Sequence, residues 1–294
     1  MPELPEVESS VKYLKEKVLR RTFLKTWTDT PKMGVVKGSL SGDFEERITG
    51  RKIEDVRRRA KNVIFELDEG LSLLIHYKMT GNLLFGRWKM VDGEWVSEIP
   101  GPLREDKMNQ YIHFIFFLDN GKQIAFSDLR KFGKVELWKR EDLKKKLSEL
   151  GPEPLSDEFT VDRFKKMIRG RRKMIKPLIM DQKFLSGVGN IYASDALWLS
   201  KIHPETEADK LSVKEIKSLY SAIREVLKEG VESDGDSMVD FRLPDGTRGN
   251  YQNKQKVYNQ TGKICKRCKK EEIEKIKVGG RGTYLCPLCQ KPKK

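Results

Sequence analysis

The sequence predicts an α+β protein, with an N-terminal helix and an antiparallel β-sandwich followed by a helical C-terminal domain and a four-cysteine zinc hairpin. Three observations predict this class. Apolar residues at helical spacing come first, short strand segments separated by turn residues run to about residue 138, and the apolar spacing then becomes helical again. The 294 residues suffice for about two domains of ordinary size.

The first predicted element is an amphipathic helix over residues 5–20. Its apolar positions recur at helical spacing, at Val7, Val11, Leu14 and Val18. Pro5 suits the first turn of such a helix, which would hold Pro2 near its positive N-terminal end.

Seven strands are predicted after this helix, with Asn120-Gly121 as the strongest hairpin signal. They cover residues 22–28, 53–57, 63–67, 71–77, 111–118, 123–126 and 135–138. Residues 86–108, which are rich in Gly, Pro, Trp and charge, are predicted to form a loop.

The second half is predicted to be helical. Ser212 and Glu215 form a capping box, with Leu211 and Ile216 as its hydrophobic staple, and this helix should stop near Gly230. Shorter helices are expected over 164–168 and 191–199, and a mobile loop over 232–256. The predicted boundaries are 2–138 for the β-sandwich, 139–154 for a linker, 155–260 for the helical domain and 261–294 for the zinc hairpin.

Composition indicates a polyanionic partner. Lys and Arg outnumber Asp and Glu by 59 to 44, which gives a net charge of +15, and each neutralised phosphate releases counterions. No stretch approaches the roughly 20 apolar residues of a membrane helix, and the acidic N-terminus does not resemble a secretory signal. With no cysteine left over for disulfides, a cytoplasmic, nucleoid-associated location is expected.

The four cysteines have the spacing of a structural zinc site. Cys265-x-x-Cys268 and Cys286-x-x-Cys289 are separated by 17 residues, within the range expected for two paired CxxC turns. Four thiolates leave no open coordination position, so the one zinc ion predicted here should be structural.

The N-terminus carries a candidate nucleophile. If Met1 is removed, Pro2 becomes a free secondary amine with the carboxylate of Glu3 beside it. Such an amine can form an iminium, and an α-amino pKa of about 7.7–8.0 leaves an unprotonated fraction at neutral pH. Together with the zinc hairpin and the positive charge, this suggests covalent chemistry on nucleic acid.

Seven motifs then occur in one order along the chain. They are Pro-Glu-Leu-Pro-Glu-Val at 2–7, Arg-Arg-Ala-Lys at 58–61, Met-Thr-Gly at 79–81, Asp-Leu-Arg-Lys-Phe-Gly at 128–133, Gly-Val-Gly-Asn-Ile-Tyr-Ala-Ser at 187–194, Val-Tyr at 257–258 and Gly-Arg-Gly-Thr-Tyr at 280–284. In this order they resemble the bacterial formamidopyrimidine-DNA glycosylases of the helix–two-turn–helix DNA glycosylase family. The resemblance extends from residue 2 to about residue 290 and implies a helix–two-turn–helix in the C-terminal domain.

The resemblance implies four catalytic residues. Pro2 would attack the sugar C1′ of the damaged nucleotide, and Glu3 would protonate the opening sugar and relay protons during elimination. Lys61 would contact a phosphate beside the lesion, and Arg281 would bind the lesion phosphates and support the second elimination.

It also implies a set of DNA contacts. Met79, Arg130 and Phe132 would fill the hole left by the flipped nucleotide, and Asn190 and Tyr258 would bind phosphates. Arg171 and Arg172 belong to a basic run, 169–173, that would follow the DNA backbone. Tyr111 stands where the family usually has a histidine; tyrosine can donate to a phosphate but carries no charge at neutral pH.

The function implied is that of a monomeric, bifunctional DNA glycosylase and AP lyase acting on damaged double-stranded DNA. It would excise oxidised purines, such as 8-oxoguanine and formamidopyrimidines, and then cleave the strand by β,δ-elimination. Two alternatives are an endonuclease VIII-type enzyme for oxidised pyrimidines, against which Leu4 argues, and a non-catalytic zinc-ribbon DNA-binding protein. The latter leaves Pro2, Glu3 and Lys61 unexplained.

Overall fold

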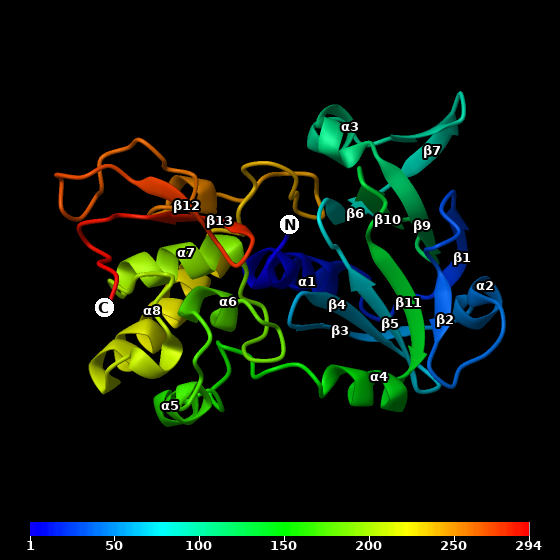
Figure 1. Cartoon of the computed structure of the whole chain (residues 1–294). Helices are drawn as coiled ribbons and strands as arrows, with labels where there is room; N and C mark the ends of the chain where they lie inside the picture. The colour runs from blue at the N-terminus through cyan, green and yellow to red at the C-terminus, as the bar shows by residue number, and fades with distance from the viewer. Residues whose placement is uncertain (294) are drawn as a thin grey trace. The chain divides into compact units, whose positions relative to one another are not determined.

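A computed structural model describes residues 1–293 of the chain, which form two compact units (Figure 1). Unit 1 comprises Met1–Glu149 and Ser233–Gln252, and unit 2 comprises Leu150–Glu232 and Asn253 onward. The α+β class predicted from the sequence is confirmed. None of the described helices is long and apolar enough to cross a membrane.

Unit 1 is a sandwich of two sheets. The first sheet has the order β1-β9-β10-β6 and consists of β1 (Phe23–Thr28), β9 (Ile112–Leu118), β10 (Gln123–Asp128) and β6 (Gly81–Gly86). The second has the order β2-β11-β5-β4-β3 and consists of β2 (Val35–Lys37), β11 (Lys134–Lys139), β5 (Leu71–His76), β4 (Asn62–Leu67) and β3 (Ile53–Arg59). All seven predicted strands are present, and β9 and β10 pair across the predicted Asn120-Gly121 turn.

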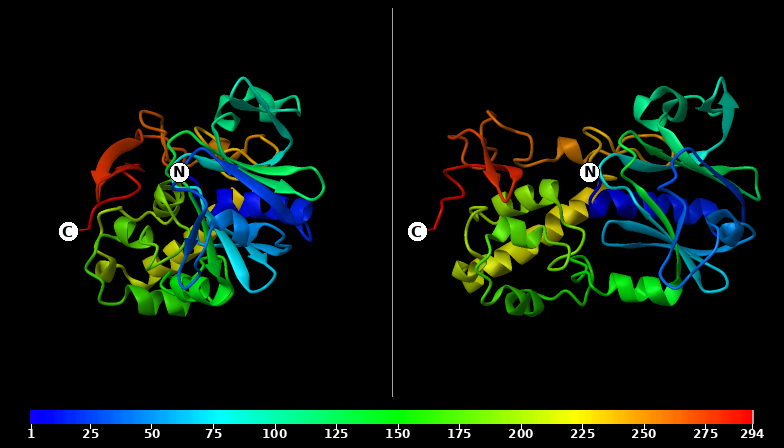
Figure 2. Two further views of the ribbon diagram at one scale, coloured as in Figure 1. Left: turned by 90° about the vertical axis from the view of Figure 1, so that its right-hand side faces the viewer. Right: turned by 45° about the vertical axis from the view of Figure 1, so that its right-hand side comes forward.

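Helix α1 (Leu4–Val18) contributes to the same core as the two sheets. Its apolar stripe at Val7, Val11, Leu14 and Val18 is buried with Phe23 and Phe116 of one sheet and Phe65 and Val135 of the other. Figures 1 and 2 show α1 alongside β3 and β4. Packing on the sheet therefore fixes the position of the helix that follows Pro2.

The predicted loop over 86–108 is wrong, because this segment is folded. It contains β7 (Trp88–Val91), β8 (Glu94–Ser97), α3 (Pro102–Glu105) and the 3-10 helix η1 (Lys107–Asn109). Trp88 and Leu103 are buried against Ile115 and Leu84 of the first sheet. Tertiary packing of these few apolar side chains overrides the polar composition of the segment. The short helix α2 (Phe44–Ile48) and strands β2 and β6 were also not predicted.

The predicted linker contains α4 (Arg140–Leu147), and the helices of unit 2 follow it. They are α5 (Val161–Ile168), α6 (Ile175–Ile179), α7 (Asn190–Leu199), the 3-10 helix η2 (Ala208–Lys210) and α8 (Val213–Glu232). The predicted capping box of α8 is present, since Ser212 N donates to Glu215 Oε2 at 2.8 Å and Glu215 N donates to Ser212 Oγ at 3.3 Å. The helix ends at Glu232, two residues past the predicted stop near Gly230, which is buried within it.

The zinc hairpin and the segment before it complete the chain. Strands β12 (Glu274–Val278) and β13 (Arg281–Leu285) form the hairpin, and β13 contacts α7. Segment 233–252 lacks helix or strand until the 3-10 helix η3 (Tyr251–Asn253), but it belongs to unit 1 and so interrupts the predicted 155–260 domain. The expectation of a mobile loop is at odds with its buried residues Gly235, Asp236 and Arg242.

Candidate functional site

The N-terminal residues Pro2 and Glu3 are buried at the start of α1. Glu3 is the N-cap residue, and its backbone N–H donates to Glu6 Oε2 at 2.6 Å, which forms half of a capping box. The Pro2 nitrogen lies in a peptide bond with Met1, whose side chain is exposed. Removal of Met1 would therefore leave a secondary amine at the positive end of a 15-residue helix, where an ammonium is disfavoured.

Lys61 occupies the two-residue turn between β3 and β4. Arg59 pairs with Asn62 across this turn, and Ala60 adopts the left-handed conformation with φ of 54°. Such a turn matches the twist of its strands and fixes the direction of its residues. Lys61 is only 6% exposed, which is unusual for a lysine.

His76, which the sequence analysis did not identify, lies at the end of β5 opposite Asn62. Burial, aided by the charges of three nearby lysines, Lys78, Lys61 and Lys134, lowers the pKa of His76 to about 3. Its Nδ1 accepts the N–H of Lys78 at 2.9 Å, so the neutral ring carries its proton on Nε2. The neutral imidazole can donate a hydrogen bond from Nε2, and the three lysines supply positive charge, so this place is suited to binding an anion. In the sequence, the one signal for His76 is its place at the end of an apolar strand segment.

The lowered pKa of His76 predicts a pH effect on stability. The pKa of His76 in the folded protein is below the value of about 6.5 in the unfolded chain. Between these two pKa values the unfolded chain binds a proton that the folded chain does not bind, so the free energy of unfolding falls as the pH drops below about 6.5. A His76→Gln variant should lack this loss, which amounts to about 3 kcal/mol at pH 4. Urea unfolding of both proteins at pH 7 and pH 4 measures the difference. Equal pH dependence in the two proteins would contradict the assignment.

Met79, Arg130 and Phe132 are brought together by one buried carboxylate. Asp128, at the end of β10, accepts the hydroxyl of Thr80, next to Met79, and the backbone N–H groups of Arg130 and Gly133. The Arg130 guanidinium lies over the Phe132 ring at 4.6 Å, and Phe132 is 53% exposed. An exposed aromatic ring beside a cation on a tightly held turn is suited to insertion between bases.

Tyr111 lies beside this cluster, because its carbonyl accepts the N–H of Asp128 at 2.8 Å. Two residues further on, His113 Nδ1 lies 3.0 Å from Asp29, which also pairs with Lys131 at 3.3 Å. Burial raises the pKa of Asp29, but hydrogen bonds from Thr30 and His113 outweigh it and leave the pKa below its usual value.

The four predicted metal ligands, Cys265, Cys268, Cys286 and Cys289, converge. Their sulfur atoms all lie within 4.8 Å of one another, with Cys265 3.9 Å from Cys289 and Cys268 3.7 Å from Cys286. A tetrahedral zinc ion with bonds of about 2.3 Å holds its sulfurs about 3.8 Å apart. These distances fit zinc and are too long for disulfides.

Groups around two of the four sulfurs, those of Cys265 and Cys268, favour the thiolate form, whereas burial raises the pKa of Cys286 and of Cys289. Burial raises the pKa of Cys265, but the N–H groups of Cys268 and Arg267 and the Trp198 indole lower it to about 6. The indole Nε1 lies 3.4 Å from Cys265 Sγ. Hydrogen bonds donated to a ligand sulfur in this way are typical of a metal site.

Arg281 begins β13, directly after the Gly279-Gly280 turn in which both residues have positive φ. Two side chains of unit 2 bind the residues that follow it. Lys176 Nζ donates to Thr283 Oγ1 at 2.8 Å, and Asn190 Nδ2 donates to the Gly282 carbonyl at 3.0 Å. Asn190 thus supports the strand that carries Arg281, and one of its two amide N–H groups makes this hydrogen bond. Lys176, 1% exposed, was missed because its apolar neighbours gave no signal.

Tyr258 packs edge-on against Tyr284 of β13, with ring centroids 5.0 Å apart. The buried carboxylate of Asp195, on α7, accepts the N–H groups of Val257 and Tyr258 at 3.0 and 3.1 Å. These bonds fix the segment before the zinc hairpin against α7.

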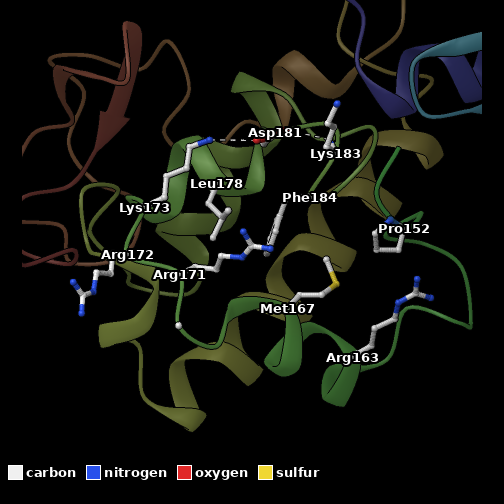
Figure 3. A pocket seen from close by; sticks show the side chains of 11 residues that line it. Pro152, Arg163, Met167, Arg171, Arg172, Lys173, Leu178, Asp181, Lys183 and Phe184 are labelled. Atoms are coloured by element: carbon white, nitrogen blue, oxygen red, sulfur yellow. Dashed lines mark hydrogen bonds and ion pairs between the residues drawn. The ribbon is translucent and has the colours of Figure 1, made fainter. Parts of the chain in front are cut away.

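Arg171 and Arg172 line a cavity of about 660 Å³ in unit 2 (Figure 3). Figure 3 shows Arg171 extending over the cavity toward Phe184, whereas Arg172 extends away from it. Lys173, the next residue, is paired with Asp181 at 3.3 Å. No ion pair involves Arg171 or Arg172 within residues 1–293, so both charges are available to an anion.

Three family models match successive parts of the chain. The formamidopyrimidine-DNA glycosylase N-terminal domain matches residues 1–135, the H2TH domain of the same enzymes matches 150–242, and the zinc finger found in FPG and IleRS matches 262–292. The first match contains Pro2, Glu3 and Lys61, and the third contains the four cysteines.

Known proteins are similar over the full length. The formamidopyrimidine-DNA glycosylase of Pelotomaculum thermopropionicum is 41% identical and covers all of both chains. Among solved structures, a variant of the Lactococcus lactis enzyme with DNA containing Fapy-dG has a TM-score of 0.84 at 32% identity, over 99% of this chain and all of that one. The wild-type Lactococcus lactis enzyme with DNA containing an oxidised pyrimidine has a TM-score of 0.83 at 33% identity, over the same shares.

Proposed function

Because the chain belongs to the formamidopyrimidine-DNA glycosylase family, we propose that it excises oxidised purines from damaged DNA through a Schiff base on Pro2 and then cleaves the strand by β,δ-elimination. The glycosylase activity on damaged DNA follows from the family. The observation that carries the finer mechanism is the burial of Pro2 and Glu3 at the positive end of α1.

The Pro2 amine, once freed of Met1, is the nucleophile. Its lone pair forms a bond to C1′ as the bond from C1′ to the base breaks. The base leaves with the electron pair of the broken bond and is protonated, while the attacking nitrogen loses its own proton. Ring opening gives an iminium, and Glu3 supplies the proton to the sugar oxygen. The iminium makes the C2′ proton acidic, so its removal expels the 3′ phosphate, and a second elimination expels the 5′ phosphate. Water then hydrolyses the iminium, which releases the sugar fragment and restores the Pro2 amine.

The cationic residues act on the phosphates. Lys61 and neutral His76, adjacent in unit 1, would bind the phosphate beside the lesion, one as a charge and one as a hydrogen-bond donor. Arg281 would bind lesion phosphates from its place on the zinc hairpin, with Asn190 and Tyr258 as further phosphate ligands. One structural zinc ion, bound by the four cysteines, would hold that hairpin rigid.

Met79, Arg130 and Phe132 would occupy the space left by the extruded nucleotide, and Tyr111 would contact the backbone nearby. The partner is damaged double-stranded DNA, bound by a monomer, since one chain carries every proposed group. Arg171 and Arg172 add positive charge that would follow the DNA backbone.

Oxidised pyrimidines are a second candidate substrate class, because the Lactococcus lactis relative was crystallised with DNA containing one. Leu4, in the motif Pro-Glu-Leu-Pro-Glu, favours purines as the main substrates.

Borohydride trapping tests the proposal. Protein with Met1 removal verified by mass is mixed with duplexes that contain 8-oxoguanine or an oxidised pyrimidine, and the expected adduct maps to Pro2 and forms faster on 8-oxoguanine. An adduct only with the pyrimidine would keep the mechanism and overturn the substrate assignment. Tight binding without any adduct would instead support the non-catalytic zinc-ribbon alternative.

A further inference from the structure

Segment 233–252 is joined to the N-terminus through one carboxylate. Glu6 Oε1 accepts the N–H of Asp236 at 2.7 Å, and Glu6 Oε2 accepts the N–H of Glu3 at 2.6 Å. A Cβ on Gly235 would lie only 2.8 Å from Glu6 Cγ, so the segment also packs closely on this side chain. The backbone next to Pro2 and the segment are therefore positioned by the same group.

A buried ion pair anchors the same segment farther along. Arg242, whose side chain is 2% exposed, donates from Nε to Asp106 Oδ2 at 2.7 Å and from Nη2 to Asp106 Oδ1 at 3.1 Å. Its Nη1 donates to the carbonyls of Phe241 and Val239 at 2.7 and 3.2 Å. A bidentate pair with two further hydrogen bonds from Nη1 holds a guanidinium in one orientation. Burial raises the pKa of Asp106, but hydrogen bonds, that of Arg242 first, keep the pKa below its usual value.

Hydrogen bonds to the backbone of residues 240–246, most of them made by side chains, extend this anchor. Asn82, on β6, donates to the Asp240 carbonyl at 2.9 Å and accepts the N–H of Arg242 at 2.9 Å. Phe85 N donates to the Pro244 carbonyl at 2.7 Å, and Asn109 Nδ2 donates to the Gly246 carbonyl at 3.0 Å. The segment is thus fixed to the first sheet and η1 at one end and to Glu6 at the other.

Only a short stretch separates the two attachments, and Val239 within it is 62% exposed. A change in the orientation of Arg242 would move this stretch and hence Asp236. Such a shift would release or tilt the Glu6 carboxylate that holds Glu3.

We propose that the Asp106–Arg242 ion pair positions the nucleophile: it sets the place of segment 233–252, which holds the Pro2–Glu3 backbone through Asp236 and Glu6. Asp106 and Arg242 are positioning residues, since they act through the segment and Glu6. The inference rests on the proposed function, because it assumes that Pro2 forms the adduct.

The test compares two arginines that share one carboxylate. Arg248 also pairs with Asp106, at 3.1 Å, but its side chain is 59% exposed. Arg242→Met and Arg248→Met each remove one positive charge beside Asp106. Comparing them therefore separates the loss of the buried anchor of segment 233–252 from the loss of charge. We expect Arg242→Met to slow single-turnover borohydride trapping on abasic-site DNA about 10- to 100-fold. Its Kd for a duplex with a non-cleavable abasic analogue should stay within about twofold of wild type, and the trapping rate of Arg248→Met should likewise change less than about twofold.

A second variant keeps the test decisive if Arg242→Met does not fold. Glu6→Gln leaves the ion pair intact but replaces one carboxylate oxygen with an NH2 donor. The N–H groups of Glu3 and Asp236 then no longer each face an acceptor oxygen, so trapping should slow comparably. Wild-type trapping rates in folded Arg242→Met, or in Glu6→Gln, would overturn the inference while leaving the Pro2 mechanism in place. Absence of an adduct with wild-type protein would instead overturn the proposed function itself.

Discussion

A chain that retains Met1 is expected to form no borohydride adduct with lesion DNA, whereas the processed chain forms one. In the unprocessed chain the Pro2 nitrogen is an amide nitrogen whose lone pair is delocalised, so it cannot attack C1′. The Met1 amine lies one residue before Pro2 and two before the N-cap residue Glu3, and Met1 itself is exposed. The same sequence thus supplies both the active form and its matched control, and trapping followed by mass measurement distinguishes them.

Pro2→Gly refines this prediction. Processing would leave a primary amine without the ring that fixes its direction, so we expect trapping to slow by about 100-fold rather than vanish. DNA affinity, measured on a duplex with a non-cleavable abasic analogue, should stay within about twofold of wild type. An undiminished adduct in the Met1-retaining protein would show that another amine, with Lys61 the first to test, is the nucleophile.

The sandwich was predictable because its strands carry their own signals. Apolar runs such as 63–67 and 71–77 are buried on both faces, and Asn120-Gly121 supplies a turn with positive φ, 69° at Gly121. The β7–β8 hairpin was missed because its strands are short and largely exposed, and Trp88 is the one apolar residue in them that is buried. Composition alone cannot show that such a residue has a partner in another strand.

The residues of the candidate site also fall into those that the sequence identifies and those that it does not. The cysteines and Pro2-Glu3 were identified because spacing and chain position carry their chemistry. Lys176 and His76 were not, because burial beside a specific partner makes them unusual, and burial is a property of the fold. Glu6 had one signal that went unused: an acid three residues after an N-cap is the second half of a capping box.

Removal of zinc is expected to abolish strand cleavage while leaving the core of unit 1 folded. Structural zinc contributes about 10–16 kcal/mol in isolated finger peptides, so the hairpin should unfold without it. The cluster around the metal, with Trp198, Val257, Ile273 and Tyr284, would lose its centre. Arg281 would then lose the fixed position that Lys176 and Asn190 give its strand, and cleavage should fall at least about 100-fold.

Trp198 provides a local readout of that unfolding. Its indole donates to Cys265 Sγ and stacks under the Arg267 guanidinium at 4.0 Å, whereas the other four tryptophans lie in unit 1. A chelator should therefore change the fluorescence of the wild-type protein but not of Trp198→Phe. Arg281→Ala should keep zinc and the fluorescence signal yet lose cleavage, whereas Lys277→Ala, which removes one charge from the same hairpin, should retain it. If metal-free protein cleaved lesion DNA at the full rate, the hairpin would have no part in elimination and the role assigned to Arg281 would be wrong.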